Sequence, residues 1–275
     1  MRADQTILFS DLDGTLFNTR GEVSPANRAA VERYIAAGGK FALSTGRAPK
    51  NLLRLIGGLP TNAPSVVLNG AAVCDLRTME YAYALHLDAA RVDPALRRAL
   101  DAFPGLDLQL YTEDGIIYAT PEETADPKYL AIHQPVQFIP YAEMAGKPVI
   151  KALLLPPPED YDALGPLLRE YAADNYELTP GTVVLDVAYR YYELMPPGVS
   201  KGSALRELRA HPELAGRTIL AVGDYWNDYE LLCAADVPIC PANAIDEIKA
   251  VCRFVTASND DHAIAHIIDE IIPAL

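Results

Sequence analysis

The sequence predicts an α/β protein in which a doubly wound parallel sheet is interrupted by an inserted α+β segment. Apolar runs of strand length alternate with helical periodicity over residues 6–84, and this alternation resumes toward the C-terminus. Residues 87–187 differ, because they are richer in proline, including Pro156-Pro157-Pro158, and mix short strand-like runs with helices. We therefore expect a core domain of residues 1–86 and 188–275 and a second domain of residues 87–187.

Turn and capping residues set the limits of the elements in the first part of the core. Ser24 and Pro25 are typical of an N-cap and a first helical turn, and Gly38-Gly39 ends the helix that they begin. Strands connected by helices of this length run parallel, with right-handed crossovers. After the apolar run 7–10, the expected elements are helices over 25–37 and 50–56 and strands over 41–44 and 65–68.

The same rules place the remaining elements. In the C-terminal part of the core, we expect helices over 200–210, 228–235, 244–251 and 262–272 and strands over 217–222, 237–240 and 253–256. In the inserted segment, we expect strands over 108–111, 115–119, 149–155 and 183–187 and helices over 94–102 and 161–173. The candidate site residues described below follow the carboxyl ends of core strands, which is where open α/β sheets bind ligands.

Composition and charge restrict the kind of protein and its partners. At 275 residues the chain can bury a substantial core, and its net charge of −14 argues against a nucleic-acid partner, which requires a basic surface. No apolar stretch reaches the roughly 20 residues of a membrane span. Because Met1-Arg2-Ala3-Asp4 leads directly into the first expected strand, we expect no signal peptide. The four cysteines form no CxxC pair, so we expect free thiols in a reducing cytoplasm. We also expect a monomer or a homodimer without a membrane partner.

A pair of aspartates follows the first expected strand, in the segment Asp11-Leu12-Asp13-Gly14-Thr15-Leu16. Alternate residues start out on the same side of a strand, so the two carboxylates are crowded. They repel each other unless a cation or a shared proton lies between them. The arrangement suits nucleophilic attack by one carboxylate and proton transfer by the other, with a metal holding the first. The alternative is a buried strand followed by an ordinary Asp-Gly turn.

Four segments together resemble the motifs of the haloacid dehalogenase-like phosphatases, in that family's order. They are Asp11–Leu16, Phe41–Arg47, Gly198–Gly202 and Gly223–Asp228, the last reading Gly-Asp-Tyr-Trp-Asn-Asp. Thr45-Gly46-Arg47, Asn69-Gly70-Ala71 and Gly198-Val199-Ser200-Lys201-Gly202 further resemble the Cof-type subfamily. The resemblance covers both ends of the chain and is weak through the middle. It implies a Rossmann-like core with a cap domain of the larger α/β (C2) type inserted between the second and third motifs.

The resemblance also implies phosphoryl transfer assisted by Mg²⁺. Asp11 is then the nucleophile that forms an aspartyl-phosphate, and Asp13 is the general acid and afterwards the general base. Ligation by oxygen atoms with retained water favours Mg²⁺ over zinc. The implied metal-binding residues are Asp11, Asp13 through its backbone carbonyl, Asp224 and Asp228, of which Asp228 stands behind the others and orients ligands or Lys201.

Other residues of the motifs are expected to hold the substrate. The implied phosphate-binding groups are the Leu12 backbone, the Thr45 hydroxyl, the Gly46 N–H, the Lys201 ammonium and the Asn227 amide. Arg47 and Asn69 are expected to contact the leaving group. Each has a plainer alternative: Thr45, Asp224 and Asp228 can cap helices, Lys201 can be a solvated surface charge, and Asn69-Gly70 can be a turn.

Two segments depart from the family pattern. The stretch Asn259-Asp260-Asp261-His262-Ala263 lacks the glycine that Cof-type chains carry there. Tyr225-Trp226 replaces a smaller or more polar pair in the fourth motif. This tryptophan, the only one in the chain, could stack on a ring of the substrate or on the cap domain, and we favour packing.

The predicted function is Mg²⁺-dependent hydrolysis of a small phosphorylated metabolite, with sugar phosphates as the leading class. The alternatives are a phosphomutase, a phosphatase for a conjugate such as sucrose phosphate, and a catalytically silent protein that binds phosphorylated metabolites. The complete set of Asp11, Asp13, Lys201 and Asp224 argues against a silent protein.

Overall fold

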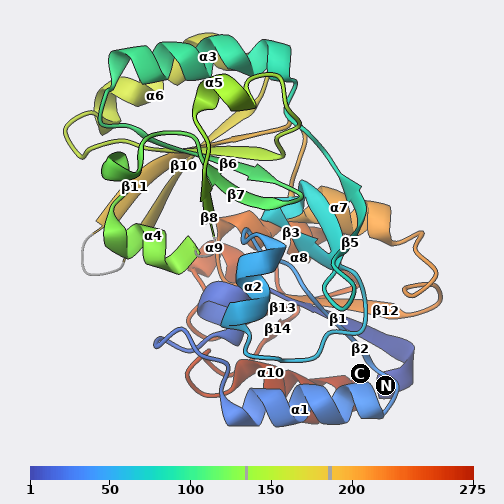
Figure 1. Ribbon diagram of the computed structural model, residues 1–275. Coiled ribbons are helices and arrows are strands. Elements are labelled where there is room, and N and C mark those ends of the chain that lie inside the picture. The colour runs from blue at the N-terminus through green and yellow to red at the C-terminus, as the bar shows by residue number, and fades with distance from the viewer. Residues whose placement is uncertain (134–135, 185–187) are drawn as a thin grey trace. The chain divides into compact units, whose positions relative to one another are not determined.

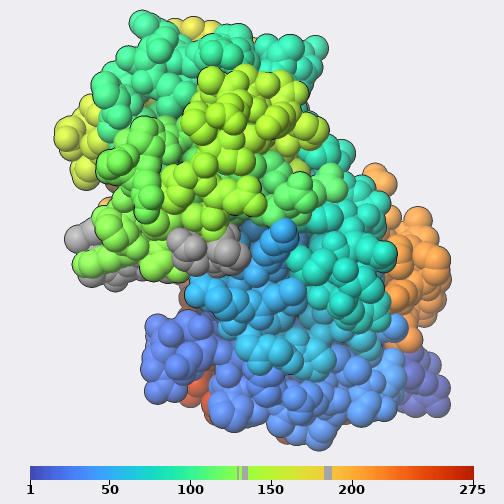
Figure 2. All heavy atoms as spheres, viewed as in Figure 1, coloured from blue at the N-terminus to red at the C-terminus, as the bar shows by residue number. Residues whose placement is uncertain are grey.

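The computed structural model describes residues 1–133, 136–184 and 188–275, which form two compact units (Figure 1). The first unit, here called the core unit, contains Met1–Tyr83 and Val199–Leu275. The second, the inserted unit, contains Ala84–Gly198. Within each unit, side chains fill the space between the ribbons, as Figure 2 shows.

The core unit contains a parallel sheet of five strands, in the order β14-β13-β12-β1-β2. The chain passes from β1 to β2 on one side and returns later to β12 on the other side, so the strand order reverses at β1. Ser10 is paired with Leu43 on one side and with Val222 on the other. The predicted α/β class with a parallel sheet is therefore confirmed. The strands are β1 (Thr6–Ser10), β2 (Lys40–Leu43), β12 (Thr218–Val222), β13 (Val237–Cys240) and β14 (Phe254–Val255).

Helices lie on both faces of this sheet, with α1 beside α10 and α7 beside α8 (Figure 1). Ser24 is the N-cap of α1, because its Oγ accepts a hydrogen bond of 3.2 Å from the Asn27 N–H. No helix in the described part of the chain is long and apolar enough to cross a membrane. The helices of the core unit are α1 (Pro25–Ala36), α2 (Pro49–Leu55), α7 (Lys201–Leu208), α8 (Tyr229–Ala234), α9 (Asp246–Lys249), α10 (Ala263–His266) and α11 (Ile272–Ala274).

The strand expected over 65–68 departs from the parallel pattern. Strand β3 (Ser65–Val67) pairs antiparallel with β4 (Ala72–Asp75) in a small sheet completed by β5 (Glu80–Ala84). An isolated parallel bridge, from Ser44 to Val66, and a hydrogen bond from the Leu43 N–H to Ser65 Oγ join β3 to the main sheet. The chain reverses within three residues, because Leu68, Asn69 and Gly70 all have positive φ angles.

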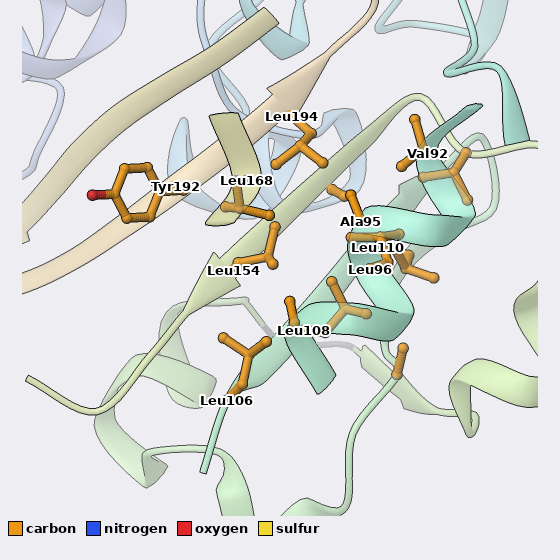
Figure 3. Packing of buried hydrophobic residues seen from close by; sticks show 14 of the residues in the cluster. Val92, Ala95, Leu96, Leu106, Leu108, Leu110, Leu154, Leu168, Tyr192 and Leu194 are labelled. Carbon is orange, nitrogen blue, oxygen red and sulfur yellow. The ribbon is translucent and has the colours of Figure 1, made fainter. Parts of the chain in front are cut away.

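The inserted unit contains a six-stranded sheet in the order β10-β11-β9-β6-β7-β8, with residues of α3, α5 and α6 packed against it. Figure 3 shows Leu108, Leu110, Leu154 and Leu194 of the sheet packed with residues of α3 and α6 in one apolar cluster. The strands are β6 (Asp107–Thr112), β7 (Gly115–Tyr118), β8 (Val136–Phe138), β9 (Lys151–Leu155), β10 (Glu177–Val184) and β11 (Ala188–Met195). The helices are α3 (Ala89–Ala102), α4 (Pro127–His133), α5 (Tyr141–Met144) and α6 (Tyr161–Ala172).

The hairpin of β10 and β11 changes the domain boundary expected at residue 188. Strand β11 pairs with β9 in the inserted sheet, and its Tyr192 ring stacks on Tyr161 at 4.6 Å, so the core unit resumes only at Val199. The expected strand 183–187 is the end of β10 as far as Val184, and residues 185–187 lie outside the described residues.

A buried carboxyl group stands at the start of β6. Asp107 is 1% exposed, and its Oδ2 accepts a hydrogen bond of 3.0 Å from Gln109 Nε2. Burial raises the pKa of Asp107 from 3.8 to about 7, although hydrogen bonds from Gln109 and Thr120 oppose the shift. The native state therefore keeps a proton that the unfolded chain releases, and stability is lost as the pH rises through this interval.

Replacing Asp107 with Asn is expected to remove this pH dependence. At pH 4 the two proteins should be about equally stable, whereas at pH 8 the variant should be more stable by on the order of 3–5 kcal/mol, since no carboxylate is buried. The measurement is hydrogen exchange of the β6 amides across this pH range, with the exposed Asp101→Asn as control. Parallel pH profiles for the wild type and Asp107→Asn would contradict the prediction.

Candidate active site

The ends of β1 and β12 bring the first and fourth motifs together. The Asp11 N–H donates to the Val222 carbonyl at 2.9 Å, so Asp11 extends β1 alongside the last residue of β12. The chain beyond Val222 continues into Gly223 and Asp224. Because both strands run parallel, Asp11 and Asp224 emerge at the same edge of the sheet.

Three carboxylates meet at this edge around one lysine. Asp11, Asp224 and Asp228 offer oxygen atoms that all lie within 4.8 Å of one another. Lys201 Nζ donates to Asp11 Oδ1 and to Asp228 Oδ1, at 2.6 Å in each case. The Lys201 side chain is fully buried, so it is not the solvated surface charge of the plainer interpretation.

The position of Lys201 follows from the packing of α7. Ser200 caps this helix, its Oγ accepting a hydrogen bond of 2.9 Å from the Ser203 N–H, and Lys201 is the first helical residue. A Cβ atom on Gly202 would lie 2.4 Å from the Glu230 carbonyl oxygen, so only glycine permits α7 to approach α8 this closely. This approach carries Lys201 to Asp228.

Asp228 organises the turn after β12. Its Oδ2 accepts hydrogen bonds from the N–H groups of Asp224 (3.0 Å) and Tyr225 (3.3 Å), while its Oδ1 accepts from Lys201. The side chain is thus committed to fixing the Asp224 backbone and the lysine. Thr15 fixes the side chain of Asp224, because the Thr15 hydroxyl Oγ1 donates a hydrogen bond of 3.1 Å to Asp224 Oδ1. The sequence contains Thr15 within the first motif, but nothing in its spacing indicated a contact with Asp224.

The charges in this cluster do not balance without a further cation. Burial and the neighbouring charge of Asp228 raise the pKa of Asp11 well above its usual value, with Lys201 acting in the opposite direction. Burial and the charge of Asp228 also raise the pKa of Asp224, to about 6. Burial acts to lower the pKa of Lys201, but the carboxylates of Asp11 and Asp228 outweigh it and the pKa is raised. The two carboxyl groups are thus shifted mainly by burial and then by neighbouring carboxylates, whereas the lysine is shifted by its carboxylate partners.

The second motif and Asn69 lie at the same edge. Thr45 is buried and its Oγ1 accepts a hydrogen bond of 3.2 Å from the Arg47 N–H, so it is not the N-cap of α2, which is Ala48. Asn69 Oδ1 accepts from Asn227 Nδ2 at 3.5 Å and would be 2.8 Å from a Cβ on Gly46. The amide of Asn69 therefore links the second motif with the fourth.

Arg47 makes a contact that the sequence did not predict. Its Nε donates to Asp13 Oδ2 at 2.8 Å and its Nη2 donates to Asp13 Oδ1 at 2.7 Å, which forms a bidentate pair. The Asp13 side chain is 56% exposed and lies outside the buried carboxylate cluster. Thus the structure places Arg47 on the second aspartate of the first motif.

The turn Leu12–Leu16 requires glycine at its centre. Gly14 has a φ of +77°, and a Cβ at this position would lie 2.4 Å from Asp224 Oδ2. The Asn243 Nδ2 donates to the Gly14 carbonyl at 2.8 Å, and the Phe17 N–H donates to the Leu12 carbonyl at 2.8 Å. These bonds hold the loop of the first motif against the carboxylate of the fourth.

Replacing Gly14 with Ala is expected to reduce activity about a hundredfold, because the new methyl group displaces the Asp224 carboxylate. It should also cost about 1 kcal/mol or more of stability from its positive φ alone. Gly21→Ala is a matched control, since Gly21 has a φ of +74° and no atom within 4 Å of its Cβ position. Both variants place alanine at a positive φ, but only Gly14→Ala puts a methyl group against Asp224. Steady-state kinetics and chemical denaturation of the two variants therefore separate the effect of this contact from that of backbone strain. Equal activity in both would contradict the prediction.

Known proteins similar to this chain include hydrolases and phosphatases. A family profile described as haloacid dehalogenase-like hydrolase matches residues 8–268. The Bacillus subtilis 5-amino-6-(5-phospho-D-ribitylamino)uracil phosphatase YwtE is 27% identical over 290 residues, covering 95% of this chain and 96% of that protein. The Bacillus subtilis phosphatase YwpJ is 27% identical over 293 residues, covering 95% and 98%. The crystal structure of TM0651 from Thermotoga maritima has a TM-score of 0.82 and 23% identity, covering 96% of both chains.

Proposed function

The chain belongs to the haloacid dehalogenase-like hydrolases and is a phosphatase, and from this premise we propose that it hydrolyses small phosphomonoesters through an aspartyl-phosphate with Mg²⁺ bound. One observation carries the proposal: Asp11, Asp224, Asp228 and Lys201 meet at one edge of the core sheet, on segments far apart in the sequence. The site residues belong to the core unit alone.

Asp11 is proposed as the nucleophile. Its carboxylate oxygen forms a bond to phosphorus while the bond from phosphorus to the leaving oxygen breaks. Asp13 gives its proton to that oxygen and later takes one from the water that cleaves the aspartyl-phosphate. Lys201 supports both steps, because its ammonium lies 2.6 Å from Asp11 Oδ1 and fixes the orientation of the carboxylate.

The remaining motif residues are proposed to hold the substrate. The Leu12 backbone, the Thr45 hydroxyl, the Gly46 N–H and the Asn227 amide supply neutral donors for phosphoryl oxygens, and Lys201 supplies the charge. Arg47 and Asn69 are proposed to contact the leaving group. The bidentate pair with Arg47 uses both Asp13 oxygens as acceptors, so the pair must open before Asp13 carries the proton that it gives to the leaving oxygen, and the released Arg47 is then free to contact the leaving group.

The donor set suits a hard divalent cation. Asp11 and Asp224 supply carboxylate oxygens, the Asp13 backbone carbonyl lies two residues after Asp11, and three carboxylates here face a single lysine. Asp11, Asp13 and Asp224 would therefore hold Mg²⁺, and Asp228 would orient them from behind. When bound, the cation supplies charge neutralisation for the carboxylates and the phosphoryl oxygens.

Sugar phosphates are the proposed substrate class. The name of YwtE describes a phosphate on a D-ribityl chain, which is said of that relative and supports a polyhydroxylated leaving group here. We further propose that the protein acts in the cytoplasm.

A panel of phosphorylated metabolites assayed by phosphate release tests the function. We expect turnover of several sugar phosphates with Mg²⁺ and its loss with a chelator, followed by recovery when excess Mg²⁺ is added. A phosphomutase would instead produce an isomeric phosphoester without free phosphate. No release from any phosphomonoester would leave the silent binding protein as the correct interpretation.

A further inference from the structure

Three aromatic side chains stand on the turn that carries the fourth motif. Tyr225 is 56% exposed, Trp226 is 53% exposed and Tyr229 is 40% exposed. The centroids of the Trp226 and Tyr229 rings lie 6.4 Å apart with an angle of 37° between their planes. About half of the Trp226 surface is therefore accessible to solvent, and its packing on the inserted unit stays a prediction. Large rings that stay in water next to a reactive site call for an explanation.

The position of Trp226 relates it to the proposed chemistry. It lies between Asp224 and Asn227, and consecutive Cα atoms are about 3.8 Å apart, so its backbone is within about 8 Å of the Asp224 backbone. An indole extends several ångströms further. The ring is therefore within reach of a group that projects from a phosphate held beside Asp224.

Hydrogen bonds to Asp228 hold the backbone of the turn that carries the rings. Asp228 is fully buried and accepts hydrogen bonds from the N–H groups of Asp224 and Tyr225 and from Lys201. Trp226 begins the 3₁₀ turn Trp226–Asp228, and Tyr229 follows three residues later on the same side. Because the backbone under the rings is held in this way, only side-chain freedom is lost when a flat ligand stacks on them.

We propose that Trp226, with Tyr229 beside it, is a stacking surface for a planar ring in the leaving group. The inference rests on the proposed function and narrows its substrate class to phosphomonoesters that carry an aryl or heterocyclic ring as well as a phosphorylated chain. A small planar ligand is favoured over a protein partner because the rings are continuous with the turn that holds Asp224, Asn227 and Asp228. Stacking on an aromatic side chain of this kind changes affinity by about tenfold or more.

A matched pair of substrates tests the proposal. Uridine 5′-monophosphate and ribose 5-phosphate carry the same phosphorylated sugar, and only the first has a ring base. We expect the wild type to prefer the ring-bearing ester by about tenfold in kcat/KM. Trp226→Leu should lose this preference while keeping turnover of ribose 5-phosphate, and Trp226→Phe should keep most of it. An equal loss on both esters would show a structural role and overturn the proposal.

Fluorescence gives a second readout that needs no turnover. Trp226 is the only tryptophan in the chain, so its emission reports on this surface alone. In the Asp11→Asn background, uridine 5′-monophosphate should quench the emission and ribose 5-phosphate should not. Equal quenching by both, or by neither, would overturn the proposal. Turnover of phosphoesters without a ring preference would overturn the stacking surface and leave the proposed function standing. Ring-dependent quenching without any turnover would support the stacking surface and overturn the proposed function.

Discussion

Replacing Asp11 with Asn is expected to abolish phosphate release, by about four orders of magnitude or more. An amide oxygen is a poor nucleophile, and the aspartyl-phosphate cannot form without the carboxylate. The fold should survive, because Asn keeps an oxygen that can accept from Lys201. In metal-free buffer, stability at neutral pH should even rise, since burial and the charge of Asp228 raise the pKa of Asp11 and so disfavour its ionised form.

The combination of lost activity and gained stability distinguishes this result from simple misfolding. The measurements are single-turnover kinetics, acid-quench trapping of the phosphorylated protein and a thermal melt. Asp269→Asn, at an exposed carboxylate paired with Arg33, is the control and should change neither quantity appreciably. Retention of activity within about tenfold of the wild type would show that another group attacks phosphorus.

Replacing Lys201 with Met is expected to destabilise the core unit by roughly 3–5 kcal/mol and to eliminate activity. Methionine replaces the aliphatic part of the lysine side chain but leaves Asp11 and Asp228 buried without their ammonium partner. Because those carboxylates must then ionise uncompensated, the loss of stability should grow as the pH rises, and the variant should be most stable at acidic pH.

Chemical denaturation between about pH 5 and pH 8 checks this dependence. Lys249→Met is the matched control, since Lys249 pairs with Asp246 at 3.8 Å on the surface, where such a pair contributes about 0–1 kcal/mol. If Lys201→Met were as stable as this control, the buried charges would have to be neutral in the wild type. A loss of stability that does not vary with pH would point to packing instead of charge.

The core could be predicted further from the sequence than the inserted unit could. Parallel strands joined by helices gather their carboxyl ends at one edge, so the convergence of Asp11, Thr45 and Asp224 follows once each is placed after a strand. The partner of Arg47 could not be predicted, because 34 residues separate it from Asp13 and only the folded loop brings them together. The contact between Thr15 and Asp224 is of the same kind.

The β10–β11 hairpin shows why sequence signals are weaker in the inserted unit. Pro180-Gly181 is typical of a turn, yet both residues lie within β10, opposite Tyr192 and Tyr191. Proline is tolerated there because β10 is an edge strand and needs no N–H on its outer side. Glycine at residue 181 leaves room for the Tyr191 ring, because a Cβ there would lie 2.2 Å from the present position of its Cε2.

The division of the chain also makes it suitable for building chimeras. The proposed reacting groups lie on Met1–Tyr83 and Val199–Leu275, so residues 84–198 can be exchanged for the corresponding segment of a relative without altering any of them. Two such hybrids would share one phosphoryl-transfer apparatus, and any difference between the esters they accept would belong to the transplanted segment.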